Sequence, residues 1–125
     1  MSKTITLPAT VIELAAEELY AGIILNDDGT PSHHLVLLPG DNDEATWEAS
    51  KAWAASINGE LPSRREQSLL FANCKQHFQQ EWYWSSEVHA SGARYAWFQG
   101  FHFGCQGHYR TLSQLRARAV RRLPI

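Results

Sequence analysis

The spacing of apolar positions changes along this chain, and each change marks a different element. Two short apolar runs, 21–25 and 34–38, stand on either side of the polar segment 26–31. That segment contains Asp28-Gly29, and glycine readily takes the positive φ that a tight turn needs. Pro39-Gly40 ends the second run. The pattern therefore predicts a β-hairpin built from these two runs.

From residue 46 to residue 58 the apolar positions recur with the spacing of an α-helix. Thr46 is placed to cap a helix that runs from Trp47 to Asn58, and Gly59 fits the position just past its end. The side chains that we expect on the inner face of this helix are Ala49, Ala52, Trp53, Ser56 and Ile57.

A second helix is predicted from Ser63 to about His77. The run Ser63-Arg64-Arg65-Glu66 fits a capping box, in which the serine oxygen accepts from the Glu66 N–H and the glutamate accepts from the Ser63 N–H. The expected buried face of this helix is Leu70, Phe71, Cys74 and Phe78.

From residue 82 onward the pattern is typical of strands and loops. Strands are predicted over 82–86, 95–101 and 116–123, and three glycines interrupt the segment before the last of them. Alternation along the last strand puts Ala117 and Ala119 on one face, and on the other face Arg116, Arg118, Val120 and Arg122. The first twenty residues are ambiguous, since 4–7 alternates like an edge strand and 11–20 can form a short helix. A hairpin, two helices and an antiparallel sheet in this order predict an α+β fold.

The length of 125 residues fits one domain, with 1–40 as an N-terminal segment and hairpin and 44–123 as the remaining core. The sequence contains no run of about 18 apolar residues, so no membrane-spanning helix is predicted. The first residues lack the apolar stretch of a secretion signal, which favours a cytoplasmic protein. In that reducing compartment we expect Cys74 and Cys105 to be two buried thiols, although a pairing between them stays open.

Charge is divided unevenly along the chain. Residues 1–62 hold ten acidic and two basic residues, whereas residues 63–125 hold three acidic and nine basic ones. Either the two halves face each other in the fold, or an acidic and a basic face steer a charged partner. The arginines are expected to pair with the acidic half and to stack on tryptophans, and the alternative is an anion-binding face. The net charge of −2 argues against general nucleic-acid binding.

No pattern in the sequence indicates a catalytic residue, a metal or a cofactor. Calcium takes about six to eight oxygen ligands, and Glu87 is the only acid in 87–115. The acidic run 41–44 is interpreted as the solvated start of the first helix. His102, Cys105 and His108 are weak zinc candidates in an H-x2-C-x2-H spacing, and the favoured interpretation is exposed histidines on a glycine-rich loop.

Three parts of the sequence together resemble one protein family. They are Thr46-Trp47 with Ala49 and Trp53, the run Gly59-Glu60-Leu61-Pro62-Ser63-Arg64-Arg65-Glu66, and Tyr83-Trp84-Ser85-Ser86 with Ala96-Trp97 and Arg118-Ala119-Val120-Arg121. This combination resembles the unknown-function family typified by the C-terminal domain of the Legionella collagen-like protein. The resemblance covers residues 44–123 and implies a C-type-lectin-like fold, with two helices packed on a twisted antiparallel sheet and no catalytic residues. The preceding hairpin is similar to that of short prophage members, which implies a phage or prophage origin.

The segment 87–115 is the candidate binding surface, because loops on a rigid scaffold often carry recognition and Tyr, Trp and Arg dominate binding hot spots. Trp97 and one of each phenylalanine pair are expected in the core. The candidate contact residues are Tyr95, Phe98, Phe101, His102, Phe103, His108, Tyr109 and Arg110.

These features favour a non-catalytic recognition module that binds a protein partner. A counter-defence accessory protein is one version that the resemblance implies. The alternatives are a calcium-independent carbohydrate-binding module that stacks sugars on aromatic faces, a zinc-dependent enzyme, and a protein that binds single-stranded nucleic acid.

Overall fold

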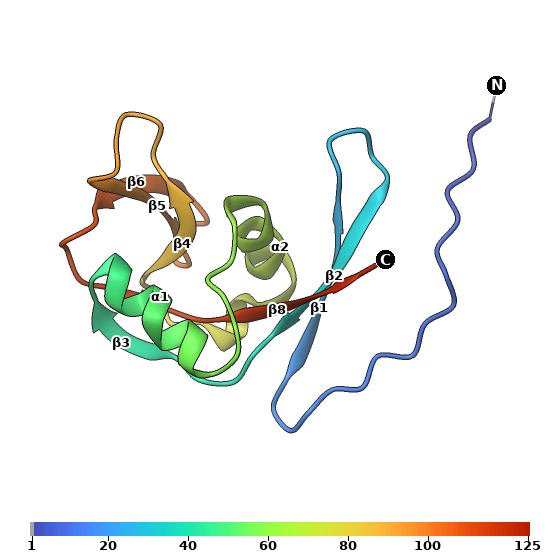
Figure 1. Cartoon of the computed structure of the whole chain (residues 1–125), viewed down its shortest axis with the longest axis horizontal. Coiled ribbons are helices and arrows are strands. Elements are labelled where there is room, and N and C mark those ends of the chain that lie inside the picture. Colours follow the sequence, from blue (N-terminus) through green and yellow to red (C-terminus); the bar gives the residue numbers. More distant parts are fainter. Residues whose placement is uncertain (1) are drawn as a thin grey trace.

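The computed structural model describes residues 2–125 and shows an α+β fold with two helices and two sheets (Figure 1). In chain order the elements are β1 (Leu19–Leu25), β2 (Pro31–Leu37), β3 (Asn42–Ala45), α1 (Trp47–Ser56), α2 (Arg64–Cys74), the 3₁₀ turn η1 (Lys75–His77), β4 (Trp82–Val88), β5 (Tyr95–Gly100), β6 (Gln106–Arg110), β7 (Leu115–Ala117) and β8 (Val120–Pro124). The strand orders are β1-β2-β8 in one sheet and β3-β7-β4-β5-β6 in the other.

The three-stranded sheet joins the predicted hairpin to the last strand of the chain. β1 and β2 pair antiparallel, with Ile23 opposite His34. β8 pairs antiparallel with the other edge of β2, with Leu35 opposite Arg122. Figure 1 shows β8 reaching across the molecule from the five-stranded sheet to this hairpin.

The five-stranded sheet is mixed, and β4 lies at its centre. β4 pairs antiparallel with β5 and parallel with β7. β6 forms the edge beside β5, and Trp97 stands opposite His108 in this pair. Because successive side chains of a strand point to opposite faces, the β4–β5–β6 ribbon presents two separate sets of residues.

Several expectations for the strands are wrong. Residues 116–123 form two strands in different sheets, because the chain passes from β7 to β8 at Arg118 and Ala119. The acidic run 41–44 is largely β3 rather than the start of a helix, and Asp41 accepts hydrogen bonds from Tyr83 and Arg116. The segment 87–115 is more ordered than a loop, since it contains β5 and β6. Residues 4–7 form no strand, and 11–18 form no helix.

Both helices form, with the predicted caps. Thr46 Oγ1 accepts from the Ala49 N–H at 3.3 Å. At α2, Ser63 Oγ accepts from the Glu66 N–H at 3.1 Å and Glu66 Oε1 accepts from the Ser63 N–H at 2.8 Å, which confirms the capping box. α2 ends at Cys74, and η1 continues to His77.

The buried face of α1 differs from the predicted one. Ala49, Ala52 and Ser56 are exposed, Trp53 and Ile57 are half-buried, and the buried positions are Trp47, Ser50 and Ala54. The indole of Trp47 fixes this rotation of the helix, because its Nε1–H donates to the Ser85 carbonyl of β4 at 2.8 Å.

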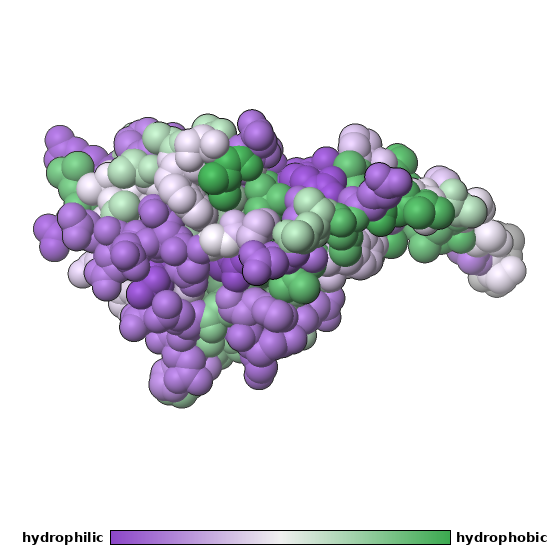
Figure 2. All heavy atoms as spheres, turned by 90° about the horizontal axis from the view of Figure 1, so that it is seen from below, coloured by the Kyte–Doolittle hydropathy of each residue, from purple (hydrophilic) through white to green (hydrophobic). Residues whose placement is uncertain are grey.

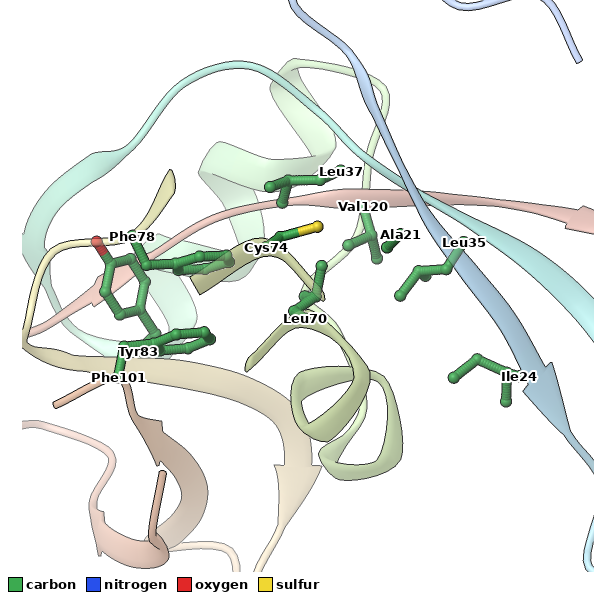
Figure 3. Close-up of a cluster of buried hydrophobic side chains, with 10 residues drawn as sticks. All are labelled: Ala21, Ile24, Leu35, Leu37, Leu70, Cys74, Phe78, Tyr83, Phe101 and Val120. Carbon is green, nitrogen blue, oxygen red and sulfur yellow. The ribbon is translucent and has the colours of Figure 1, made fainter. Parts of the chain in front are cut away.

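One cluster of buried side chains lies between the three-stranded sheet, α2 and β4 (Figure 3). Its members are Ala21, Ile24, Leu35, Leu37, Leu70, Cys74, Phe78, Tyr83, Phe101 and Val120. Phe78 and Phe101 stack with 3.8 Å between ring centroids, and Tyr83 meets both rings edge-on. These aromatic contacts join the end of β5 to the segment that follows α2.

A second cluster packs α1 against the five-stranded sheet. Its members are Leu38, Trp47, Ala54, Leu61, Trp84, Ala96, Phe98, Leu115, Ala117 and Ala119. Trp84 is fully buried at its centre, and its Nε1–H donates to the Ala45 carbonyl of β3 at 2.9 Å. The amide of Gln67 on α2 donates to the carbonyls of Tyr83 and Trp84, so both helices hold β4 in place.

The acidic and basic halves of the chain face each other in the fold. The ion pairs between them are Arg65–Asp27, Arg116–Asp41, Arg116–Asp43, Arg121–Glu18 and Arg122–Glu60. Arg118 is buried, and its guanidinium donates to the carbonyls of His77 and Leu38 at 2.6 and 2.7 Å. The expected pairing with the acidic half is confirmed for Arg65, Arg116, Arg121 and Arg122, but not for Arg118.

Residues 2–18 form an extended segment that runs outside the two sheets (Figure 1). Its apolar side chains Ile5, Leu7, Val11 and Leu14 are exposed, and Figure 2 shows hydrophobic residues on this projecting part of the molecule. Arg121 of β8 holds the end of the segment by donating to the Glu13 carbonyl and the Glu18 carboxylate.

Candidate functional site

The predicted contact residues divide between the two faces of the β4–β5–β6 ribbon. Tyr109 points to the face that carries Trp82 and Phe98, because its ring meets the edge of the Trp82 indole. Tyr95 and His108 point to the opposite face, where the Tyr95 ring meets the His108 ring edge-on and His108 lies against Trp97. The candidates therefore do not form one surface.

Two of the predicted contact residues are buried and belong to the core. Phe98 is 8% exposed, because it lies under the Trp82 ring. Phe101 is 4% exposed, because it stacks between Phe78 and Tyr83 (Figure 3). Trp97, which was expected in the core, is instead half-buried. The exposure of Phe98 and Trp97 depends on the register of β5, which the sequence alone does not fix.

A groove of about 480 Å³ opens beside Trp82, and we call it the Trp82 groove. Its walls include Glu44, Glu81, Trp82, Phe98, His102 and Phe103. Trp82 is 47% exposed and stacks on Phe98, with 4.2 Å between ring centroids and 17° between ring planes. Tyr109 meets the same indole edge-on at 5.6 Å, so the exposed ring is fixed from two sides. Phe103 is 80% exposed on the groove wall.

Two glycines shape the Trp82 groove. Gly107 stands opposite Phe98, and a Cβ at this position would come within 2.9 Å of the Phe98 ring. Gly100 stands opposite Trp82, so no side chain on β5 covers the indole from that position. The two glycines thus let Phe98 lie flat beneath Trp82 and leave the indole open to solvent.

The rim of the Trp82 groove is negatively charged. Glu44 and Glu81 line it with exposed side chains, and neither forms an ion pair with any residue in the range 2–125. Arg116 also lines the groove, but its guanidinium lies 3.0 Å from Asp41 and 3.6 Å from Asp43. The groove therefore combines an aromatic wall with uncompensated carboxylates.

On the opposite face, four side chains form what we call the Trp97 cluster: Arg64, His89, Trp97 and His108. The Arg64 guanidinium lies 3.5 Å above the Trp97 ring. His89 packs against Trp97 at 4.9 Å and against His108 at 4.0 Å between ring centroids. Burial, the neighbouring His108 and the Arg64 charge all lower the pKa of His89.

The zinc candidates do not converge on one point. His102 stacks on Phe103 at the groove, whereas His108 lies in the Trp97 cluster on the other face. Within residues 2–125, no group of three or more His, Cys, Asp or Glu side chains is placed to hold a metal ion. Cys74 and Cys105 are both free, and Cys105 is exposed, so the expectation of two buried thiols is wrong for Cys105. Burial raises the pKa of the Cys74 thiol.

The sequence matches no protein-family model and no curated protein. Across residues 2–125, none of the helices has both the length and the apolar character needed to cross a membrane.

Sequence reasoning did not place Trp82, Arg64 or His89 among the contact residues, although Arg64 is one of the arginines for which an anion-binding face is the alternative. Trp82 is the first residue of a strand that also carries the fully buried Trp84, so composition alone predicts both as core. The signal that separates them is the cross-strand partner, which is Gly100 for Trp82 and Phe98 for Trp84. Arg64 lies 33 residues before Trp97 in the chain, and only the folded structure brings the two together.

Proposed function

We propose that this protein is a non-catalytic recognition module that binds a protein partner through the Trp82 groove. The observation that carries this proposal is the half-exposed Trp82 ring, which Phe98 and Tyr109 hold in a fixed orientation. Tryptophan anchors in grooves are typical hot spots of protein interfaces. Because the stack forms within the fold, the indole loses little conformational entropy when a partner binds.

The chemistry of the groove favours a partner segment that carries an arginine or a lysine. The aliphatic stem of such a side chain would lie along the indole, and its charge would approach Glu44 and Glu81. A cation over a tryptophan ring contributes about 0.5–2 kcal/mol, depending on how far it is desolvated. Unpaired carboxylates on the rim add charge complementarity, which steers a basic segment toward the site.

A C-type-lectin-like scaffold of phage or prophage type is part of this proposal. The two helices and the largely antiparallel pairing support the scaffold, whereas the phage or prophage type depends on the sequence resemblance alone. On this account the basic segment belongs to a host protein met in the cytoplasm. A counter-defence accessory protein is the concrete version, and it depends on the family resemblance of residues 44–123.

A second candidate is calcium-independent carbohydrate binding at the same groove. The face of Trp82 could stack on a sugar ring, and Gln80 and Gln114 line the groove with amides that pair with hydroxyls. The carboxylates of the rim favour the basic peptide over a neutral sugar.

Selection from a random peptide library on the immobilised full-length protein tests the proposal. We expect the selected peptides to share an arginine or a lysine, and their recovery to fall by about tenfold or more on the Trp82→Ala variant, because the anchor is lost. Tyr20→Ala is the matched control, since Tyr20 is an exposed aromatic on β1 of the other sheet. Its recovery should equal that of the unmodified chain.

A glycan array probed with the unmodified chain, Trp82→Ala and Tyr20→Ala decides between peptide binding and carbohydrate binding. A glycan that requires Trp82, with no peptide enrichment, would assign the groove to sugars and overturn the protein partner. Equal peptide recovery on the unmodified chain and on Trp82→Ala would show that the groove is not the binding site.

A further inference from the structure

The Trp97 cluster concentrates positive charge on one small area of the sheet. Arg64 comes from the first turn of α2, His89 follows β4, and Trp97 and His108 stand opposite each other on β5 and β6. The other charged groups on these elements and on the loop after β4 include Arg65, Glu66, Glu87, Arg94 and Arg110. Glu66 is buried and paired with Arg122, and Glu87 Oε2 accepts from the backbone N–H of Arg64 at 2.7 Å.

The arginines of this region differ from the others in their partners. Arg65, Arg116, Arg121 and Arg122 all form ion pairs with carboxylates. Arg64, Arg94 and Arg110 form none with any side chain in the part of the chain that the structure describes. These three arginines are therefore left without a compensating carboxylate, although the chain as a whole carries a net charge of −2.

The donors of the cluster are held in place before any ligand arrives. Arg64 lies flat on Trp97, and its Nε–H donates to Gln106 Oε1 at 3.0 Å, while Gln106 donates back to the Arg64 carbonyl at 2.7 Å. The terminal nitrogens of the guanidinium remain as donors. His89 Nδ1 accepts from the Ser91 N–H at 3.2 Å, so the ring proton sits on Nε2, which can donate to a ligand.

We propose that the Trp97 cluster binds a phosphate group through Arg64, His89 and His108. A tetrahedral dianion offers several acceptor oxygens to one guanidinium and two imidazoles, and it compensates the charge of Arg64. The Arg64 guanidinium covers a face of Trp97, which disfavours the ring as a stacking platform for nucleobases. The site is separate from the Trp82 groove and does not depend on the function proposed for it.

Binding at this site is coupled to protonation of His89. Because burial, His108 and Arg64 lower the pKa of His89, this imidazole is mostly neutral near pH 7 without a ligand. A bound dianion favours the protonated form, so saturating phosphate should raise the pKa of His89, which is measured by following its Hε1 resonance against pH with and without phosphate.

Titration of the full chain with inorganic phosphate at constant ionic strength tests the site. The imidazole Hε1 resonances of His89 and His108 are followed by NMR and assigned with His89→Asn and His108→Asn. We expect both resonances to shift, and the affinity to fall by about tenfold or more in Arg64→Gln. Arg65→Gln is the matched control, since Arg65 is the next residue on α2 and is paired with Asp27. Its affinity should stay within about twofold of the unmodified chain.

A second titration, with an oligothymidylate of ten nucleotides, identifies the source of the phosphate. If inorganic phosphate binds through Arg64 and the oligonucleotide does not, the ligand is a free phosphate or a phosphate monoester. If both bind through Arg64, a nucleic-acid backbone is the source. Equal affinities of Arg64→Gln and Arg65→Gln for both probes would overturn the proposal. Trp82→Ala should bind phosphate like the unmodified chain, so the two proposals fail independently.

Discussion

Glu66→Gln should lower the free energy of unfolding by about 3–5 kcal/mol, which is the expected cost of breaking a buried ion pair. Glu66 is 1% exposed. Its Oε1 accepts from the Ser63 N–H and from Arg122, each at 2.8 Å, and its Oε2 accepts from Arg122 and from His33, each at 2.7 Å. This carboxylate therefore links α2 to β8 and β2. A glutamine keeps the size but turns an amide donor toward donors that have lost their acceptor.

Urea unfolding of the unmodified chain and of Glu66→Gln measures this loss of stability. A loss of that size is a large part of the roughly 5–15 kcal/mol that a domain usually has. Glu48→Gln is the control, because Glu48 forms an exposed pair with Lys51, and such pairs contribute about 1 kcal/mol at most. If Glu66→Gln and Glu48→Gln unfold at the same urea concentration, the carboxylate does not hold α2 to the three-stranded sheet.

The same group should set the acid stability of the fold. Burial alone would raise the pKa of Glu66, but hydrogen bonds from Arg122, Ser63 and His33 outweigh it and lower the pKa to about 2. Since this pKa lies below the unfolded value, the stabilisation is complete above about pH 5 and is lost as the pH falls toward 2. The loss from this one group should be about 3 kcal/mol. Glu66→Gln should show a correspondingly flatter dependence on pH over this range.

Trp82→Ala should weaken the binding of a basic peptide selected on the groove by about 30-fold or more, since hot-spot anchors contribute about 2 kcal/mol or more. The loss arises because the variant lacks the exposed indole, which Phe98 and Tyr109 hold in a fixed orientation in the unmodified chain. Isothermal titration calorimetry measures the effect, and near-ultraviolet circular dichroism checks that the variant keeps its packed core. Trp82→Phe should recover part of the affinity, because a smaller aromatic face remains.

The carboxylates of the rim give a second check on the same site. A double variant, Glu44→Gln with Glu81→Gln, should bind the peptide more weakly and with less dependence on salt, because it removes the unpaired charges. Tyr20→Ala should bind like the unmodified chain. An equal loss in Tyr20→Ala and Trp82→Ala would mean that the peptide responds to exposed aromatic rings in general and not to the groove.

Local chemistry made some elements predictable from the sequence. The hairpin turn, the Thr46 cap and the Ser63–Glu66 capping box depend only on residues close in the chain, and all of them form as expected. The rotation of α1 was not predictable, because it depends on a hydrogen bond from Trp47 to Ser85, 38 residues away. The break between β7 and β8 has a similar origin, since buried Arg118 bonds to carbonyls of His77 and Leu38.

The candidate site, too, was predictable only in part from the sequence. Tyr109, His102 and Phe103 were expected near a binding surface, and they lie at or beside the Trp82 groove. Whether an aromatic residue of β4 or β5 is exposed depends on which face it takes and on its cross-strand partner. Phe98 is covered by Trp82, and Trp82 is left open by Gly100, and neither relation follows from composition.

The proposed function requires the Trp82 indole to be the binding contact, while the buried Trp47 and Trp84 hold the scaffold. Fluorine NMR of the full chain labelled with 5-fluorotryptophan tests it directly, because each of the five indoles gives its own resonance and Trp82→Phe assigns one of them. With a selected basic peptide, we expect a large shift of the Trp82 resonance and unchanged resonances for buried Trp47 and Trp84. An unchanged Trp82 resonance at saturating peptide would contradict it.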